Sequence, residues 1–294
     1  MSLSIRPQVI STQGQDVSRI GLSAALVRRL GAGSIRAFAM ALGLLYRIYE
    51  RNLLNGLDKD RLPRHIGIVL DGHRRHAREE RLPTYTDSYR VGMRRFEEFL
   101  GWAHELDIPA VTAWVLSKEN LSRPEEELEP YFQVLIELFE RLPALCEKYD
   151  MAIKFIGSLD LLPDQLVSAA KTAEEAHPRG SKRLNVAMGY GGRQEIVDAA
   201  KDLVSTLLSD GVPPEEVATY IDADALASHM YSADMPDPDL LIRTSGESRL
   251  SGFLLWQSAY AEFVFVDVNW PAFRRVDFLR ALRDFTSRER RFGK

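Results

Sequence analysis

Residues 65–76 read HIGIVLDGHRRH, an unbroken apolar run that ends at a charged turn containing a glycine. Continuous apolar runs are typical of strands that are covered on both faces, because alternation of apolar and polar residues is expected only where one face of a sheet meets water. We therefore expect residues 65–70 to form a buried strand of a parallel sheet, with the charged turn at its carboxyl end.

Five more short apolar runs come later in the chain, separated by longer stretches in which apolar residues recur at helical spacing. Strands are predicted at 65–70, 110–116, 152–156, 183–188, 239–243 and 263–268, and helices at 93–106 and 128–147. This alternation predicts an α/β fold with a single open, mainly parallel six-stranded sheet and helices on both faces. Bulky residues of the two helices are expected to be plain core or to line an apolar tunnel: Phe96, Phe99, Phe132, Leu135 and Phe139.

The composition is that of an ordinary globular protein. The chain has 294 residues, of which 45% are hydrophobic and 27% charged, and its net charge is −4. These values exclude disordered classes, and they leave no overall positive field to attract nucleic acid, so no nucleic-acid partner is expected. The single cysteine, Cys146, excludes an internal disulfide and suits the reducing cytoplasm, where we expect the protein.

The beginning of the chain differs from the rest. Residues 1–33 are expected to form a flexible tail, 34–58 an amphipathic helix, and 59–294 a single domain. Apolar residues in 34–58 recur at helical spacing among arginines, which is typical of a core or dimer-packing helix but also of a helix lying on a membrane surface. Both interpretations stay open. No apolar run reaches the roughly 18 residues that a membrane span requires.

The turn after the first strand predicts a phosphate site, since ligands of open α/β sheets bind beyond the carboxyl ends of the strands. Gly72 permits close approach of the backbone to an anion, and the forked side chains of Arg74 and Arg75 match phosphate oxygens. Asp71 is suited to hold Mg²⁺ that bridges to the phosphate. The alternative is a loop whose charges only pair with each other.

A second cluster of residues suited to bind phosphate lies at and after the end of the fifth strand. Arg243, Arg249 and Ser251 repeat the pattern of arginines with small polar residues. Two such clusters on one edge indicate two anionic groups bound together. Arg123 is either a third cation of this site or a partner of the acidic run 125–127.

Glu262 stands just before the last strand among apolar neighbours. An unpaired carboxylate is costly in such surroundings, so a metal ion or an arginine is expected beside it. The motifs of P-loop nucleotide-binding proteins, zinc proteases and serine hydrolases are absent from the sequence.

Four blocks of the chain resemble the signature regions of the cis-prenyltransferase, or undecaprenyl diphosphate synthase, family. They read DGHRR at 71–75, LSKENLSRP at 116–124, GYGGR at 189–193 and IRTSGESRLSGFLLWQ at 242–257. The resemblance runs from about Tyr46 to the C-terminus, and the last block is long enough to be highly specific. Within the family, the chain is most similar to the short-chain branch, the (2Z,6E)-farnesyl diphosphate synthases.

This resemblance implies a Mg²⁺-dependent enzyme that condenses isopentenyl diphosphate with an allylic diphosphate, for which geranyl diphosphate is expected. The product would be a Z-prenyl diphosphate such as (2Z,6E)-farnesyl diphosphate. The allylic C–O bond would ionise, the isopentenyl double bond would attack the cation, and a proton would be lost. The resemblance also implies a homodimer, and Arg291-Phe292-Gly293 is similar to the family's R-x-G terminus, which reaches the partner subunit's site.

The resemblance assigns roles to individual residues. Asp71 would hold the metal ion with Glu262, and Asn120 stands in the position assigned to proton removal. His73, where the family usually has Asn, is expected to replace that residue as a hydrogen-bond donor in catalysis. The substrate-binding residues implied are Gly72, Arg74, Arg75, His76, Tyr89, Ser117, Lys118, Glu119, Arg123, Arg243, Arg249, Leu250 and Ser251.

Departures from the family pattern leave alternatives open. His76 and Leu121 stand where Trp is usual, and Tyr89 where His is common. One alternative is a variant that makes irregular or longer prenyl products. A second is a non-catalytic subunit of a heteromeric prenyltransferase, which the retained Asp71 and arginine clusters disfavour. A nucleotide-binding or phosphatase-like protein would need a purine pocket or a nucleophile, and neither is identifiable.

Overall fold

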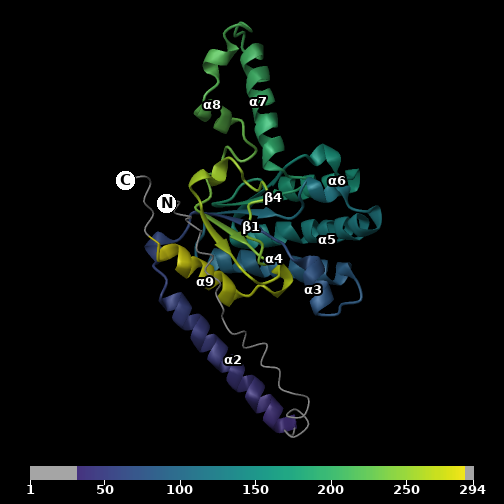
Figure 1. Ribbon diagram of the computed structural model, residues 1–294, viewed down its shortest axis with the longest axis vertical. Coiled ribbons are helices and arrows are strands. Elements are labelled where there is room, and N and C mark those ends of the chain that lie inside the picture. The colour runs from purple at the N-terminus through teal and green to yellow at the C-terminus, as the bar shows by residue number, and fades with distance from the viewer. Residues whose placement is uncertain (1–31, 289–294) are drawn as a thin grey trace, which may run out of the picture. The chain divides into compact units, whose positions relative to one another are not determined.

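The computed structural model describes residues 32–288, and one six-stranded sheet organises the part from residue 53 onward. Its strands are β1 (His65–Val69), β2 (Ala110–Trp114), β3 (Met151–Ile156), β4 (Lys182–Ala187), β5 (Leu240–Arg243) and β6 (Glu262–Phe265). They lie in the order β3-β4-β2-β1-β5-β6, and every neighbouring pair is parallel (Figure 1). The predicted open parallel sheet and its six strands are confirmed.

The described helices alternate with the strands. They are α2 (Ala32–Asn55), α3 (His73–Glu79), α4 (Tyr85–Glu105), α5 (Glu125–Tyr149), α6 (Asp164–Ala176), α7 (Gly192–Ser209), α8 (Ala223–Ser228) and α9 (Arg275–Thr286). The helices predicted over 93–106 and 128–147 correspond to α4 and α5, both of which begin earlier. The early start of α4 has a local cause, because Thr84 and Asp87 form a capping box in which each side chain accepts from the other's backbone N–H.

The chain divides into two units, residues 1–52 and 53–294. Of the first unit the structure describes α2 from Ala32 onward, and the helix expected over 34–58 ends at Asn55. None of the described helices combines the length and the apolar character needed to cross a bilayer. Residues 1–31 of the expected tail, and Arg291-Phe292-Gly293, lie outside the described residues.

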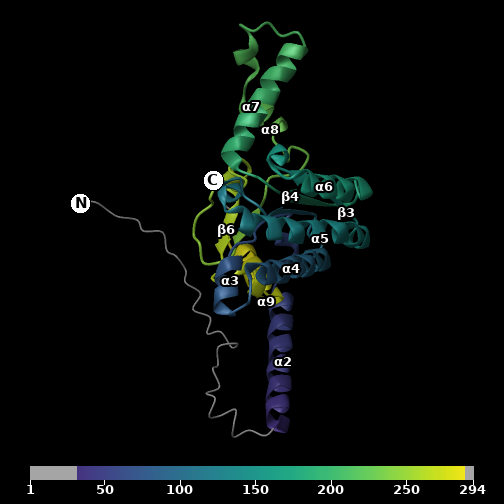
Figure 2. The same cartoon turned by 90° about the vertical axis from the view of Figure 1, so that its right-hand side faces the viewer.

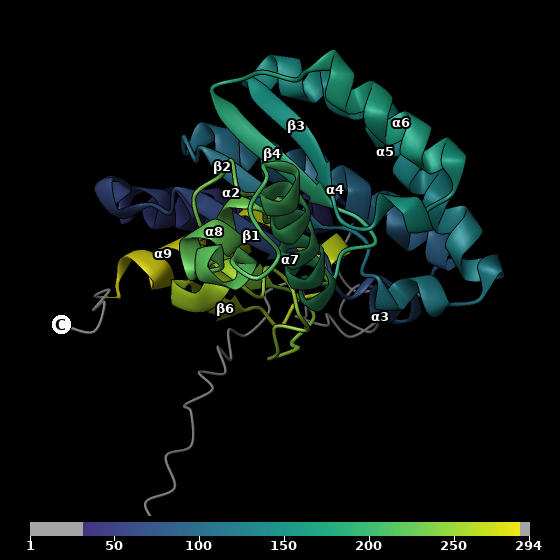
Figure 3. The same ribbon diagram turned by 90° about the horizontal axis from the view of Figure 1, so that it is seen from above.

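Helix α4 packs against α5 and against α9 through aromatic side chains (Figures 1 and 2). Phe99 of α4 meets Phe278 of α9 edge-on, with 5.0 Å between ring centroids, and Tyr89 of α4 lies 4.5 Å from Tyr131 of α5. Helix α6 packs beside α5 and the edge strand β3 (Figure 3). The residues considered for a tunnel are buried in this core: Phe96, Phe99, Phe132, Leu135 and Phe139. A tunnel remains a prediction.

The opposite face of the sheet is covered by irregular chain as well as by helix. Phe253 stacks on Trp114 of β2 at 5.2 Å with only 7° between the rings. Gly67 of β1 makes room for this cluster, since a Cβ there would lie 2.1 Å from Leu241 Cδ2 and 3.1 Å from Phe253 Cε1. Burial of each such aromatic side chain contributes about 1.5–3 kcal/mol, so the loop carrying Phe253 is held firmly against the sheet.

Buried titratable groups of the core are kept neutral by desolvation. Burial raises the pKa of the Cys146 thiol to about 12, which agrees with a packing cysteine and not with a nucleophile. At the start of β1, His65 Nδ1 lies 2.6 Å from the Pro236 carbonyl and Nε2 lies 2.8 Å from Thr112 Oγ1. Since a carbonyl only accepts, Nδ1 carries the proton. Burial lowers the pKa of His65 to about 4.

Stability should therefore depend on pH through buried histidines. Burial lowers the pKa of both His65 and His73 from 6.5 to about 4. Below pH 6.5 these histidines bind protons in the unfolded chain but not in the folded chain. Their contribution to the free energy of unfolding is therefore fully present above pH 6.5 and is lost as the pH falls toward 4. Each histidine contributes a slope of about 1.4 kcal/mol per pH unit.

Urea unfolding of wild type and of the variant His65→Gln between pH 6 and pH 5 measures this contribution. We expect the slope of the free energy of unfolding against pH to decrease in the variant by about 1.4 kcal/mol per unit. Identical slopes in the two proteins would show that His65 is protonated equally in the folded and unfolded chains.

Candidate active site

Polar segments from four strands meet at the carboxyl edge of the sheet, which we call the rim. Asp71 follows β1, the short helix η3 (Glu119–Ser122) follows β2, residues 189–193 follow β4, and Arg243 ends β5. Because all strands are parallel, these segments lie at the same edge. A bridge between Ser117 and Tyr190 joins two of them directly.

The backbone of Asp71 is fixed from two sides. Thr244 Oγ1 accepts from Asp71 N at 3.0 Å and lies 2.8 Å from the Asp71 carbonyl oxygen, to which it can donate. Trp270 N donates to the same carbonyl at 2.9 Å. Thr244 was not predicted as a site residue, although it directly follows Arg243 in the longest signature block. Its hydroxyl ties the ends of β1 and β5 together.

The Asp71 carboxylate is paired with a buried guanidinium. Arg243 Nη2 donates to Asp71 Oδ2 at 2.9 Å, while Nη1 donates to Ser251 Oγ at 2.7 Å and to the Arg249 carbonyl. The N–H of Gly72 donates to Asp71 Oδ1 at 2.7 Å. The Arg243 side chain is 8% exposed and that of Asp71 40%, so the carboxylate faces outward in front of a fixed cation.

The other four rim arginines share two carboxylates. Glu247 pairs with Arg249 at 2.6 Å and with Arg75 at 3.2 Å. Glu127 pairs with Arg123 at 3.0 Å and with Arg74 at 3.5 Å. The alternative prediction, that charges of the rim pair with one another, is thus correct for these contacts, and so is the expectation that Arg123 meets the acidic run.

These ion pairs still leave the rim with excess positive charge. Five arginines, including Arg243, face three carboxylates, including Asp71. Exposed ion pairs are worth only about 0–1 kcal/mol each, so Arg74, Arg75 and Arg249, whose side chains are 45–66% exposed, can exchange a carboxylate for a phosphate oxygen at little cost. The arrangement favours binding of anions at the rim.

The segment after β5 carries unusual backbone strain. Ser245, Ser251 and Leu254 all have positive φ, at 74°, 53° and 44°, and Gly246 and Gly252 are positive as well. Each non-glycine residue in this region costs roughly 1–3 kcal/mol, and such strain gathers at functional sites. The left-handed turn at Ser251 accompanies the contact of its hydroxyl with Arg243.

The loop after β2 holds the remaining polar residues of the rim. Ser117 Oγ accepts from Asn120 N at 3.1 Å, and Asn120 Oδ1 accepts from Arg123 Nη2 at 2.9 Å. Lys118 Nζ donates to Gln194 Oε1 at 2.7 Å. The Glu119 carboxylate lies close to Gly191, 3.8 Å from where a Cβ there would stand.

Tyr89 and Leu250 border the rim from opposite sides. Tyr89 OH donates to Glu127 Oε1 at 3.2 Å. Burial, together with the nearby Glu127 charge, raises the pKa of Tyr89 to about 12, so its hydroxyl stays protonated. Leu250 packs, partly buried, against the core cluster around Phe253.

Two histidines lie between α3 and α4, joined by Ser88. Ser88 Oγ donates to the His73 carbonyl at 2.8 Å, so it must accept from His76 Nδ1, 3.0 Å away, and His76 Nε2 keeps a lone pair when the ring is neutral. The His73 ring packs on α4, where a Cβ at Gly92 would lie 2.1 Å from His73 Cε1. Its Nε2 is buried without a hydrogen bond, and burial lowers the pKa of His73 to about 4.

Glu262 is the predicted site residue that the structure does not bring to the rim. Strand β6 begins at Glu262, which is level with Leu240 and, through it, with Ile66 of β1. Asp71 lies five residues beyond Ile66, about 16 Å along the strands at roughly 3.3 Å per residue. Glu262 Oε2 instead accepts from Arg288 Nη1 at 2.6 Å. Within one chain, therefore, Asp71 and Glu262 lie too far apart to share a metal ion.

The donor set of the rim fits a hard divalent cation held largely by a ligand. Within residues 32–288, no three His, Cys, Asp or Glu side chains come together as a ready metal cluster. Asp71 presents a half-exposed carboxylate beside Arg243, and Mg²⁺ is commonly held by one or two carboxylates plus phosphate oxygens and water. Such an ion would depend on a bound phosphate to complete its coordination.

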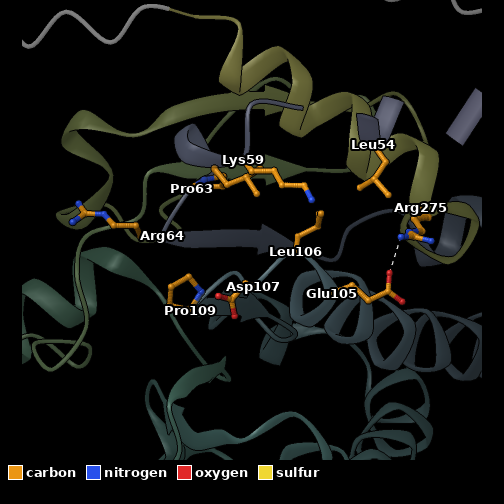
Figure 4. A pocket seen from close by; sticks show the side chains of 10 residues that line it. Leu54, Lys59, Pro63, Arg64, Glu105, Leu106, Asp107, Pro109 and Arg275 are labelled. Atoms are coloured by element: carbon orange, nitrogen blue, oxygen red, sulfur yellow. Dashed lines mark hydrogen bonds and ion pairs between the residues drawn. The ribbon is translucent and has the colours of Figure 1, made fainter. Parts of the chain in front are cut away.

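A cavity of about 510 Å³ lies away from the rim, near the amino ends of β1 and β2 (Figure 4). Its lining contains no predicted site residue and consists of Leu54, Lys59, Leu62, Pro63, Arg64, Glu105, Leu106, Asp107, Pro109 and Arg275. A narrower cavity lies beside Arg243, Arg249 and Leu250, floored by Phe253 and Phe263. We take the rim as the candidate active site because the predicted site residues other than Glu262 gather there, whereas none of them lines the larger cavity.

Comparison with known proteins shows the family to which the sequence is similar. A family model described as "Putative undecaprenyl diphosphate synthase" matches residues 69–293. The chain is 48% identical over 252 residues to a (2Z,6E)-farnesyl diphosphate synthase of Thermobifida fusca, covering 85% of this chain and 97% of that protein. It is 44% identical over 253 residues to a short-chain Z-isoprenyl diphosphate synthase of Mycobacterium bovis, covering 85% and 96%.

A solved structure shares the fold. Lavandulyl diphosphate synthase from Lavandula x intermedia, crystallised with dimethylallyl diphosphate, superposes with a TM-score of 0.74 at 30% identity. The superposition covers 80% of this chain and all of that one. The parallel sheet and its covering helices are therefore those of this group of proteins.

Substitution of Gly72 tests how tightly the turn after β1 is built. Its φ is +104°, and a Cβ would lie 2.4 Å from Asn269 Oδ1 and 3.0 Å from Asn269 Cα. We expect Gly72→Ala to lower the free energy of unfolding by about 1–2 kcal/mol from backbone strain and by about 1–3 kcal/mol more from the clash.

Gly211→Ala is the matched control in urea unfolding. Gly211 also has positive φ, at +86°, but nothing lies within 4 Å of its Cβ position, so only the strain is expected there. Equal losses of stability in the two variants would mean that the Asn269 contact relaxes freely.

Proposed function

The chain belongs to the undecaprenyl diphosphate synthase family of prenyltransferases, and we propose that it is a short-chain cis-prenyltransferase. It condenses isopentenyl diphosphate with an allylic diphosphate, geranyl diphosphate in the first place, to form a Z-prenyl diphosphate such as (2Z,6E)-farnesyl diphosphate. The names of the Thermobifida and Mycobacterium relatives support a short product.

The position of Arg243 carries this proposal. One nitrogen of its guanidinium contacts Asp71, beside the Gly72–Arg75 turn, and the other contacts Ser251, beside Arg249. The two expected diphosphate sites are thus neighbours that share one buried cation. Two substrates bound there have their reacting carbons close together, which is the entropic requirement of a condensation.

The rim supports the ionisation step. As the allylic C–O bond breaks, negative charge grows on the departing diphosphate, and Arg74 and Arg75 stabilise it by releasing their carboxylate partners. Bound Mg²⁺, with Asp71 as its protein ligand, would neutralise further charge on the same group. Arg249 and Ser251 hold the isopentenyl diphosphate so that its double bond attacks the cation.

The last step is transfer of a proton from the isopentenyl unit, near Asn120, to an oxygen of the released diphosphate, which leaves the new double bond. The Asn120 side chain is oriented by Arg123, whose guanidinium donates to Oδ1. His73 is neutral at pH 7, and its Nδ1 lies 3.4 Å from the Ser88 carbonyl, which only accepts. The buried, unpartnered Nε2 is then an acceptor, so we propose that it receives a hydrogen bond when the site is filled and does not take the donor role of the asparagine.

The opposite position of Glu262 supports a homodimer with shared sites. If both carboxylates serve one metal ion, Asp71 and Glu262 must come from two copies of the chain, because they lie at opposite edges of one sheet. Glu262 would then exchange Arg288 for the metal ion of the partner subunit. We propose this assembly, a cytoplasmic location and peripheral membrane contact through 34–58 as further properties of the protein.

The purified protein should form a prenyl product from geranyl diphosphate, labelled isopentenyl diphosphate and Mg²⁺. We expect Asp71→Asn, or removal of Mg²⁺ by a chelator, to lower kcat at least about 100-fold, the size of loss typical for electrostatic groups at a reacting centre. Asp234→Asn, which breaks exposed ion pairs with Lys154 and Arg183 away from the rim, is the control and should keep its activity.

Mass analysis of products from each primer separates the alternatives. A product from dimethylallyl diphosphate alone would favour irregular coupling, which the structural likeness to lavandulyl diphosphate synthase brings into question. Absence of product from dimethylallyl, geranyl and farnesyl diphosphates alike would contradict the proposal and favour a non-catalytic subunit.

Mixed dimers test the shared metal site. Two inactive variants, Asp71→Asn and Glu262→Gln, are co-expressed with different tags and purified as the mixed dimer. If each site takes Asp71 from one copy and Glu262 from the other, one of the two sites is intact and about half of the wild-type activity returns. No recovery would exclude sharing between copies.

A further inference from the structure

Glu195 is a fully buried carboxylate that the proposed reaction does not use. It lies in the first turn of α7, with 0% of its surface exposed. Its two oxygens accept three hydrogen bonds, from Tyr190 OH, from Tyr231 N at 3.1 Å and from Gln257 Nε2 at 2.9 Å. The three donors come from three separate segments of the chain.

The Tyr190 contact leads to the loop after β2. Tyr190 N donates to the Leu116 carbonyl at 3.2 Å, and Lys118 N donates to the Tyr190 carbonyl at 3.0 Å. The backbone of Tyr190 is thus paired on both sides with the loop that carries Ser117 and Asn120. Its ring is held by Glu195 at the hydroxyl and by Trp114 and Phe253 at its edges.

The Gln257 contact leads to the segment that carries Arg249 and Ser251. Gly192 N, at the start of the same helix α7, donates to the Gly252 carbonyl at 2.9 Å. A Cβ at Gly192 would lie 2.4 Å from that carbonyl oxygen and 2.6 Å from Leu255 Cβ, so the helix and the segment touch through backbone atoms. Together with Gln257, this contact fixes the far end of the strained segment 245–254.

Substitution of Glu195 is expected to be costly because its buried carboxylate is the acceptor of three donors. Burial raises the pKa of the Glu195 carboxyl, and its hydrogen bonds act in the opposite direction. Truncation of this acceptor leaves the Tyr190 hydroxyl and the Tyr231 N–H without this hydrogen bond, while Gln257 Nε2 keeps only Ser232 Oγ at 3.3 Å. Each unsatisfied group costs roughly 1–3 kcal/mol. The loops attached to those donors can lower this cost only by moving.

We propose that Glu195 is a positioning residue that holds the reaction-centre loop, 116–123, and the isopentenyl-binding segment, 249–257, in register with each other. This role rests on the proposed function, because it assigns one substrate to each segment. It also goes beyond that function, since Glu195 contacts neither substrate and acts from behind the rim through Tyr190 and Gln257.

Kinetics of Glu195→Ala and Glu195→Gln test the role. In the alanine variant we expect KM for both substrates to rise about tenfold and kcat to fall about 100-fold, as misplacement by about 1 Å does. In the glutamine variant the carbonyl oxygen can still accept from Tyr231 and Gln257, while its NH₂ donates to the Tyr190 hydroxyl. Glutamine should therefore restore both constants most of the way toward wild type, since Tyr231 and Gln257 keep their acceptor and only the Tyr190 O–H loses its own.

Tyr190→Phe separates the two arms of the network. This variant loses only the hydroxyl contact with Glu195 and keeps the ring packing. We expect kcat to fall while KM for isopentenyl diphosphate is unchanged, because the Gln257 arm is intact. A rise in that KM equal to the rise in Glu195→Ala would contradict the separation.

Asp239→Asn is the matched control. Asp239 is also a buried carboxylate that accepts from backbone N–H groups, those of Arg64 and His65, but it lies at the other edge of the sheet. We expect Asp239→Asn to lower the melting temperature and to leave both KM values unchanged. If Glu195→Ala behaves in the same way, Glu195 has a structural role only and the proposal is overturned.

Binding of inorganic pyrophosphate, measured by calorimetry, keeps this test independent of turnover. We expect Glu195→Ala to weaken pyrophosphate binding about tenfold relative to wild type and Asp239→Asn, by the same misplacement of the rim. Equal affinities of the three proteins would overturn the positioning role. Wild-type protein that binds pyrophosphate but forms no prenyl product would count against the proposed function alone.

Discussion

The ion pair between Arg243 and Asp71 is the contact on which the rim depends. Burial of an arginine side chain is costly unless its charge and its N–H groups have partners, and the two Nη groups of Arg243 find theirs in Asp71, Ser251 and the Arg249 carbonyl. Those partners lie on different loops, so the loops can occupy only the positions that satisfy one rigid, planar group. Its Nε is buried and without a partner, which shows that this geometry is kept at some energetic cost. The buried cation therefore sets the distance between the two proposed anion sites.

The exposed rim arginines have the opposite character. Arg75 and Arg249 share Glu247, and Arg74 and Arg123 share Glu127, in pairs that are open to solvent on at least one side. Each carboxylate pairs with two arginines at once, as a diphosphate could, and so keeps their side chains oriented. These ion pairs contribute little to the stability of the fold. The rim thus combines one fixed cation, Arg243, which holds the loops in place, with exposed arginines that can change partners. In the proposed reaction these exposed arginines would pair with the diphosphate as it departs.

The sheet was predictable because its signal is local. Continuous apolar runs mark the buried strands, and the residues directly after each strand must lie at the carboxyl edge, so Asp71, Arg123 and Arg243 could be assigned to one rim from their order alone. By the same rule Glu262, which stands at the beginning of its strand, belongs at the amino edge. Strand polarity alone therefore places Glu262 away from Asp71, although the resemblance to the family groups the two residues in one metal site. Glu195 was not predictable in this way. Its partners Tyr231 and Gln257 are 36 and 62 residues away, and nothing in a helical first turn indicates that a glutamate there faces inward.

The strained segment 245–254 connects these observations. Left-handed serines and a left-handed leucine would relax to ordinary conformations if either end of the segment were free, because each holds roughly 1–3 kcal/mol of strain. One end is held by Arg243 through Ser251 and Arg249, and the other by Gln257 on the buried carboxylate. The aromatic stack of Phe253 on Trp114 supplies burial energy between the two ends and so compensates the strain. A segment fixed at both ends and in the middle loses little further conformational entropy when a substrate binds. In the proposed role, Glu195 would strengthen substrate binding in this way without contacting the substrate.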